Sequence, residues 1–189
     1  PAGTTLEFQM HYTPVGRPAV DASKIGSWVM ETPPKHRVFT TMIANPRIKI
    51  PPHARNHKET MTRKIPKDAL LYSMLPHAHF RGKAMEMGVT YPDGSYELLL
   101  SVPNYDFNWQ TSYELAEPKL IPAGSTLVQH NWWDNSAQNK ANPDPNIEVR
   151  WGEQSFEEML FGAFMMRFLD EEEMAVLKAD NVQTVSQRN

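Results

Sequence analysis

The stretch that decides the fold is a predicted β-hairpin at residues 84–102, with the sequence AMEMGVTYPDGSYELLLSV. Met85, Met87 and Val89 recur at every second position, which is the period of a strand with one buried face. The tetrapeptide Tyr91-Pro-Asp-Gly94 predicts a tight turn, because proline presets the first turn dihedral and glycine accepts a positive φ. A second strand after this turn completes an antiparallel pair.

The segments on either side of this hairpin also have the pattern of short strands between turn signals. Further strands are predicted at residues 5–12, 38–44, 69–75 and 125–133, and within the aromatic segment 105–113. The composition of residues 134–145 predicts a loop. Near the end, Asp170-Glu-Glu-Glu173 is a capping box that predicts a short helix at about 171–179. We therefore expect an all-β fold, an antiparallel β-sandwich with a short C-terminal helix.

Composition excludes several classes of protein. The 189 residues are 40% hydrophobic and 22% charged, as in globular proteins, and suffice for one domain or slightly more. A net charge of −3 with both signs interspersed argues against nucleic acid as a partner, and no apolar run is long enough for a membrane span. The chain has no cysteine but 7 histidines and 11 methionines, so a soft metal ion would be bound by His and Met.

Two segments carry candidate metal ligands. In PHAHFRGK (76–83), His77 and His79 have the His-x-His spacing that places both imidazoles on one face of a strand. This suits two ligands of one ion, although the spacing alone is more typical of two exposed polar residues. In WGEQSFEEM (151–159), Met159 precedes an apolar run, where a methionine is usually a core residue. Ser155-x-x-Glu158 could also cap a short helix here.

Together these segments resemble a known family. HAHFRGK followed by SFEEM is similar to the second catalytic domain of the type II copper, ascorbate-dependent monooxygenases, which include peptidylglycine α-hydroxylating and dopamine β-monooxygenase. There, two histidines and a methionine bind the copper that activates dioxygen, and the matching residues are His77, His79 and Met159. FQMHY (8–12) resembles the end of the first catalytic domain, so His11 matches one ligand of the electron-transfer copper. The likeness covers about residues 2–168 and is strongest to bacterial members.

The resemblance makes the expectations specific. It implies a jelly-roll sandwich at 34–170, with residues 1–33 as the last strands and linker of an otherwise missing N-terminal copper domain, and 171–189 as a short helix and frayed tail. It also implies dioxygen, a small-molecule or peptide substrate that is hydroxylated at a C–H bond, ascorbate or another electron donor, and export to the periplasm or the extracellular space. The ligand chemistry agrees, because a thioether favours Cu(I), whereas zinc more often takes a further nitrogen, a thiolate or a carboxylate.

The chain also departs from the family. No His-His pair occurs, so the second copper site is reduced to His11, and the chain alone is not expected to perform coupled hydroxylation. The peptide-processing enzyme has an arginine, a tyrosine and a cysteine where this chain has Leu75, Ala163 and Leu160. These differences disfavour amidation of peptides and catecholamine chemistry, and they predict a more apolar pocket.

The remaining histidines and two alternative functions complete the expectations. His130 is interpreted as structural, His53 and His57 as loop residues, and His36 as a solvated linker residue. One alternative function is a non-catalytic copper-binding module, in which Met159 merely favours Cu(I). The other is a metal-free jelly-roll interaction domain with the two histidines as surface residues.

Overall fold

The computed structural model describes residues 3–12 and 14–177, and within these it has ten strands. The chain divides into two compact units, residues 1–35 and 36–189. The strands all lie in the second unit: β1 (Phe39–Ala44), β2 (Lys49–Ile50), β3 (His57–Lys64), β4 (Ala69–His77), β5 (Gly82–Thr90), β6 (Tyr96–Val102), β7 (Tyr113–Ile121), β8 (Thr126–Trp133), β9 (Val149–Arg150) and β10 (Phe161–Phe168).

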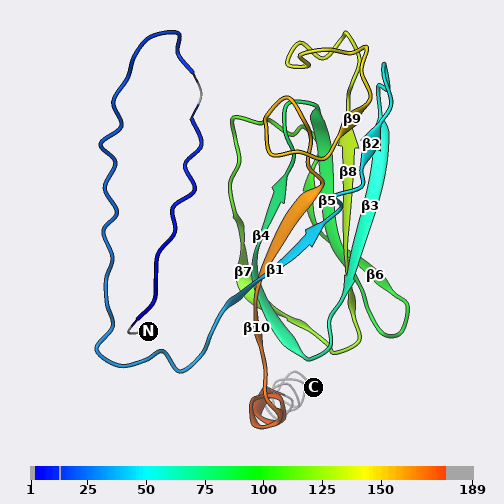
Figure 1. Ribbon diagram of the computed structural model, residues 1–189. Coiled ribbons are helices and arrows are strands. Elements are labelled where there is room, and N and C mark those ends of the chain that lie inside the picture. Colours follow the sequence, from blue (N-terminus) through cyan, green and yellow to red (C-terminus); the bar gives the residue numbers. More distant parts are fainter. Residues whose placement is uncertain (1–2, 13, 178–189) are drawn as a thin grey trace. The chain divides into compact units, whose positions relative to one another are not determined.

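Eight of these strands form two four-stranded antiparallel sheets, ordered β1-β10-β4-β7 and β3-β8-β5-β6 (Figure 1). Each successive strand of the eight crosses to the other sheet, except where the β5–β6 hairpin stays within one. This order is that of a jelly roll, in which Greek-key connections join two packed sheets. Strands β2 and β9 form a separate two-stranded ribbon. The predicted all-β jelly-roll sandwich is therefore confirmed.

The central hairpin follows the sequence pattern closely. Tyr91 N donates to Ser95 O at 2.8 Å, and Gly94 has the positive φ of 88° that this turn requires. The register of β5 and β6 shifts between Met87 and Gly88. A Cβ atom at Gly88 would lie 2.4 Å from the Tyr96 hydroxyl oxygen, so only glycine fits at this bulge.

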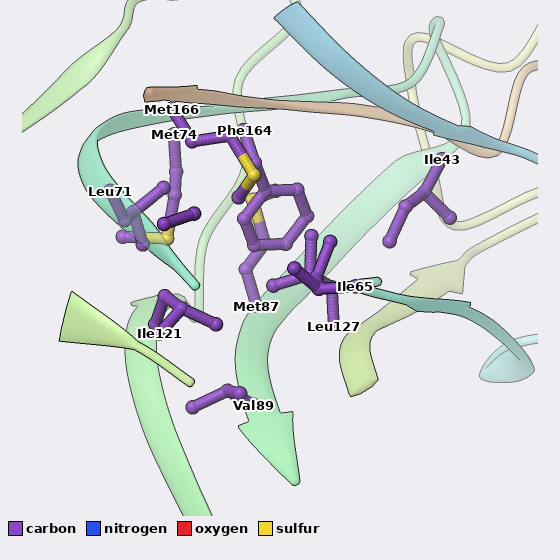
Figure 2. Close-up of a cluster of buried hydrophobic side chains, with 11 residues drawn as sticks. Ile43, Ile65, Leu71, Met74, Met87, Val89, Ile121, Leu127, Phe164 and Met166 are labelled. Atoms are coloured by element: carbon purple, nitrogen blue, oxygen red, sulfur yellow. The ribbon is translucent and has the colours of Figure 1, made fainter. Parts of the chain in front are cut away.

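The hydrophobic core fills the space between the two sheets (Figure 2). The β1-β10-β4-β7 sheet contributes Leu71 and Phe164, and the opposite sheet contributes Met87 and Leu127; all four are fully buried. A second cluster surrounds the buried Trp133 at the other end of β8. Where a strand has one buried face, alternate residues face the core, so apolar residues recur at every second position of the sequence.

The predicted strands at 38–44, 69–75 and 125–133 correspond to β1, β4 and β8, and residues 134–145 contain no strand. Five strands were not predicted: β2, β3, β7, β9 and β10. Strand β3 has a single apolar side chain in HKETMTRK, whereas β10 is apolar on both faces in FGAFMMRF. Neither pattern alternates, so periodicity could not reveal them. The same β3 begins at His57, which corrects its interpretation as a loop residue.

Two predicted strands are wrong. Residues 5–12 carry no strand, and Leu6 and Phe8 are exposed. The described part of the first unit contains no other strand to which this segment could hydrogen-bond, and a lone strand leaves its backbone groups unpaired. The segment 105–112 forms turns before β7, with Trp109 70% exposed. Here Asp106 accepts the backbone N–H of Asn108, a local bond that competes with strand pairing.

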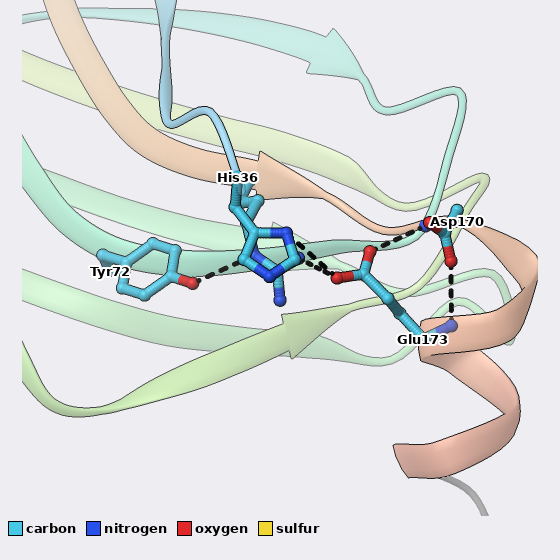
Figure 3. A network of polar contacts seen from close by, with 5 residues as sticks. His36, Tyr72, Asp170 and Glu173 are labelled. Carbon is cyan, nitrogen blue, oxygen red and sulfur yellow. Dashed lines mark hydrogen bonds and ion pairs between the residues drawn. The ribbon is translucent and has the colours of Figure 1, made fainter. Parts of the chain in front are cut away.

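The predicted C-terminal helix is present at residues 171–177, and residues 178 and 179 lie outside the described part. Its capping box is confirmed: Glu173 N donates to Asp170 Oδ1 at 2.9 Å, and Asp170 N donates to Glu173 Oε2 at 3.1 Å. Arg167 of β10 binds the Glu173 carboxylate, and His36 lies 3.3 Å from it, so His36 is not simply solvated (Figure 3). No helix in the described residues is both long and apolar enough to span a membrane.

Truncation of a core side chain between the two sheets should lower the free energy of unfolding. Phe164→Ala is expected to lower the free energy of unfolding by about 3–5 kcal/mol, because it removes a fully buried ring and leaves a cavity. Urea denaturation measures this loss. The matched control is Phe156→Ala, whose side chain is 58% exposed and whose loss should cost less than about 1 kcal/mol. Equal costs for the two variants would contradict this assignment of the core.

Candidate functional site

The structure brings the two predicted histidines together at one end of the sandwich. His77 is the last residue of β4, and His79 follows in the connection to β5. Their ring centroids are 5.1 Å apart, with the ring planes nearly perpendicular at 84°. His79 is buried and His77 is half-buried. Gly82 N donates to His79 O at 3.0 Å, so a closed turn holds the connection in which His79 lies.

The Nδ1 atoms of both imidazoles lie close to oxygen atoms. His77 Nδ1 lies 2.5 Å from Gln110 Oε1, and Gln110 Nε2 donates to Phe107 O, which identifies Oε1 as the acceptor. His79 Nδ1 lies 3.3 Å from Glu157 O, and a carbonyl oxygen can only accept. Both Nδ1 atoms thus face oxygen acceptors, and a ring that donates from Nδ1 in this way has its lone pair on Nε2. Histidine metal ligands commonly have this arrangement, with the second nitrogen donating to an oxygen.

Strand β10, which follows Met159, pairs with the strand that ends at His77. Phe161 is the cross-strand partner of His77, and their rings are in contact at 5.8 Å between centroids. The paired register of β10 and β4 ends at this pair, and Met159 lies two residues before Phe161, outside it. Burial alternates along this segment, because Glu158 and Leu160 are buried while Met159 and Phe161 are half-buried. That the Met159 sulfur joins the two imidazoles stays a prediction.

Glu158 was not predicted to be a site residue. Its hydrogen bonds hold the backbone around the site in place. Its fully buried carboxylate accepts the backbone N–H groups of His79 at 2.8 Å and Arg81 at 2.6 Å, and the Trp133 indole N–H at 2.9 Å. Burial raises the pKa of Glu158 to about 7, an effect that these hydrogen bonds and the Arg81 charge oppose. No sequence signal separates such a glutamate from a surface one, since Glu157 beside it has the same side chain.

The buried side chain of Arg81 also stabilises the loops around the site. Its fully buried guanidinium donates to Asn135 Oδ1 at 2.9 Å and to Phe156 O at 2.7 Å. Burial lowers the pKa of Arg81, and the carboxylate of Glu158 opposes this shift. The guanidinium therefore joins the loop after β8 to the loop before β10, which carries Met159.

The remaining histidines belong to the first unit or make contacts of their own within the second unit. His11 is exposed in the first unit, and its role as a copper ligand stays a prediction. His130 bonds to Thr60 Oγ1 at 2.7 Å on the outer face of β8, and His57 lies 3.1 Å from Glu59. Among the described residues, no three His, Asp or Glu side chains form a metal-binding group.

The residues present fit copper. Two neutral imidazoles with the lone pair on Nε2 bind Cu(I) and Cu(II), and a thioether is a soft donor that favours Cu(I). Zinc and the hard cations are poorly served by this donor set, because they prefer thiolate, carboxylate or carbonyl ligands.

Comparison with known proteins bears only on the fold. No protein-family model and no curated protein matches the chain. Among solved structures, the chain is similar to the VP2 subviral particle of infectious bursal disease virus, with 10% identity and a TM-score of 0.32 over 84% of this chain and 47% of that chain. The structure of the Gx strain of this virus gives the same identity and TM-score, covering 48% of its chain. This chain thus spans about half the length of these structures.

Removing the acceptor at the centre of the site should destabilise the fold. Glu158→Gln is expected to lower the free energy of unfolding by about 3 kcal/mol at pH 8, because an amide N–H₂ group must then face N–H donors in the interior. Urea denaturation measures the loss, and Glu153→Gln on the exposed part of the same loop is the matched control. A variant as stable as the wild type would show that the Glu158 carboxylate does not hold this region together.

Proposed function

We propose that this chain is the oxygen-activating domain of a copper-dependent monooxygenase of the type II, ascorbate-dependent family, with His77, His79 and Met159 as the copper ligands. The observation that carries the proposal is the pair of adjacent imidazoles whose Nδ1 atoms both face oxygen acceptors. When bound, copper would supply the one-electron chemistry by which dioxygen hydroxylates a substrate C–H bond.

The chain's own residues prepare this site. Gln110 and the Glu157 carbonyl orient the two rings and hold their lone pairs on Nε2. The Glu158 carboxylate fixes the backbone of His79 and, through its 3.3 Å bond from Met159 N, that of Met159 itself. His77 lies at the end of a strand, and buried hydrogen bonds hold the backbone at His79 and Met159, so collapse of the ligands would not close a position for dioxygen.

The proposal also covers the parts of the enzyme beyond this copper site. His11 would be the one ligand in this chain of a second, electron-transfer copper, and the other ligands would come from an N-terminal copper domain. Ascorbate or another donor would supply electrons, and the protein would work in the periplasm or outside the cell. The residues that differ from the peptide-processing enzyme, Leu75 among them, disfavour a glycine-extended peptide as the substrate.

Replacement of the proposed sulfur ligand tests the site directly. The wild-type chain is expected to bind one Cu(I) with a sulfur neighbour in its X-ray absorption spectrum, and Met159→Ile should lose that sulfur signal with unchanged circular dichroism. Met30→Ile, at a 64% exposed methionine in the first unit, is the matched control. A sulfur signal that persists in Met159→Ile would refute the ligand assignment. Absence of stoichiometric copper in the wild type would favour the metal-free interaction domain.

Measurement of oxygen consumption distinguishes a catalytic copper site from one that only stores copper. In a protein that also carries the N-terminal copper domain, Met159→Ile should abolish reductant-dependent oxygen uptake, which an oxygen electrode measures. Nearly undiminished uptake in this variant would defeat the proposal. Bound copper without any uptake by the wild type, across a broad substrate panel, would support the non-catalytic copper-binding module instead.

Loss of the hydrogen bond behind His77 should weaken copper binding without loss of the fold. Gln110→Leu is expected to reduce Cu(I) affinity about 10–100-fold, because His77 then loses the acceptor that fixes its tautomer. Competition with a chromogenic Cu(I) chelator measures the affinity. Gln138→Leu, on a loop between β8 and β9, is the control and should leave the affinity unchanged. Equal affinities for wild type and Gln110→Leu would show that Gln110 does not position the ring.

A further inference from the structure

A cleft opens between the two sheets at the side where their edge strands are β1 and β3. Its volume is about 640 Å³, and residues of β1 and β10 line one side while β3 and the residues after it line the other. Phe39, which lines the cleft, begins β1, whereas Ala44 at the other end of that strand is in register with Phe161 and His77. The cleft therefore lies at the far end of β1 from the candidate copper site.

The floor of the cleft is a part of the hydrophobic core that the sheets leave uncovered. Phe39 is the cross-strand partner of the fully buried Met166, so its ring projects toward the core, yet it is 47% exposed. The rings of Phe39 and Phe168 are in contact, with their centroids 6.0 Å apart. Ile65, which is fully buried among the core side chains in Figure 2, lines the opposite side. An apolar group that enters the cleft would therefore exchange water for aromatic and aliphatic neighbours.

Two cationic side chains of β3 line the same cleft. Arg63 is the cross-strand partner of the fully buried Leu127, so its side chain starts on the inner side of the sheet, and its Nη1 donates to the Met42 carbonyl of β1 at 2.8 Å. Lys64 follows it in the strand and is exposed. Neither forms an ion pair with a carboxylate of the described residues, and none of the described residues lining the cleft is acidic. The cleft therefore combines apolar walls with a positive charge that the protein does not neutralise.

We propose that this cleft is a binding site for an amphiphilic carboxylate, a ligand of fatty-acid type in which a hydrocarbon chain ends in an anionic group. The chain would lie against Phe39 and Phe168, and the Arg63 guanidinium, whose N–H groups match the two oxygens of a carboxylate, would bind the anionic end with Lys64 beside it. A cationic head would be repelled at the same place, and an uncharged head would lose the charge-assisted hydrogen bonds. The site is separate from the proposed copper site, and neither proposal requires the other.

Three probes that share a hydrocarbon chain and differ in the head group test the proposal: octanoate, octan-1-ol and octylammonium. Each is titrated into the full chain at neutral pH, below the concentration at which it aggregates, and binding is followed by two-dimensional NMR. Octanoate is expected to shift the Phe39, Thr41 and Phe168 signals saturably. Octan-1-ol should bind at least about fivefold more weakly, because it lacks the charge-assisted hydrogen bonds, and octylammonium more weakly still. Equal affinities for the three probes, or no saturable shift at the cleft, would overturn the proposal.

Variants of the two cationic residues locate the anion site. Arg63→Gln should weaken octanoate binding at least about threefold and leave octan-1-ol binding unchanged, because it removes the charge and keeps a polar side chain. Lys64→Gln should act in the same direction to a smaller extent, and its exposed position covers the case in which Arg63→Gln fails to fold. Arg47→Gln, in the exposed turn after β1, is the matched control and should leave the octanoate affinity unchanged. An equal loss in the control would assign the effect to the net charge of the protein and overturn the site.

The same variant separates ligand binding from a simpler role of Arg63. A charged side chain that points inward on an edge strand prevents that strand from pairing with another chain. If Arg63→Gln associates in sedimentation velocity, while octanoate binds the wild type no better than octan-1-ol, the residue only protects the edge and the proposal fails. Cleft signals that shift with protein concentration alone would assign the cleft to contact with a second copy of the chain and would likewise overturn the ligand site.

Discussion

The structure around the candidate site depends on one buried carboxylate. Glu158 accepts hydrogen bonds from the β4–β5 connection, from Trp133 at the end of β8 and from Met159 beside it, so segments far apart in sequence meet at one anion. A carboxyl group in the interior is unfavourable unless its oxygens are satisfied, which is why burial raises its pKa although several N–H groups point at it. That requirement fixes the backbone on both sides of the site.

A rigid backbone of this kind would suit the metal site that we propose at one end of the jelly roll. The two imidazoles come from a single connection, whereas the groups that orient them, Gln110 and the Glu157 carbonyl, come from two other loops. The sandwich supplies strands that end together, and the loops supply the polar contacts. Function on this view resides in the site, since jelly rolls as a class serve many purposes.

Much of the fold could be predicted from sequence, because one-sided burial leaves a period of two in strands such as β5 and β8. Strand β10 was not predicted, because it is apolar on both faces. Residues 5–12 were wrongly predicted to be a strand, because an alternating pattern does not supply a partner strand. The His77 and His79 pair could be predicted from spacing, whereas Met159 rests on resemblance and stays a prediction. Glu158 and Gln110 could not be predicted, because hydrogen bonds between distant loops leave no local pattern.

The most direct test of the account is the protonation of the two imidazoles, observed by long-range ¹H–¹⁵N NMR of the histidine rings. In the metal-free chain, His77 and His79 should both be Nδ1–H tautomers, and addition of one equivalent of Cu(I) should move both Nε2 resonances to metal-bound positions while the Nδ1 resonances stay protonated. Nε2–H tautomers in the metal-free chain, or Nε2 resonances that ignore Cu(I), would contradict the account.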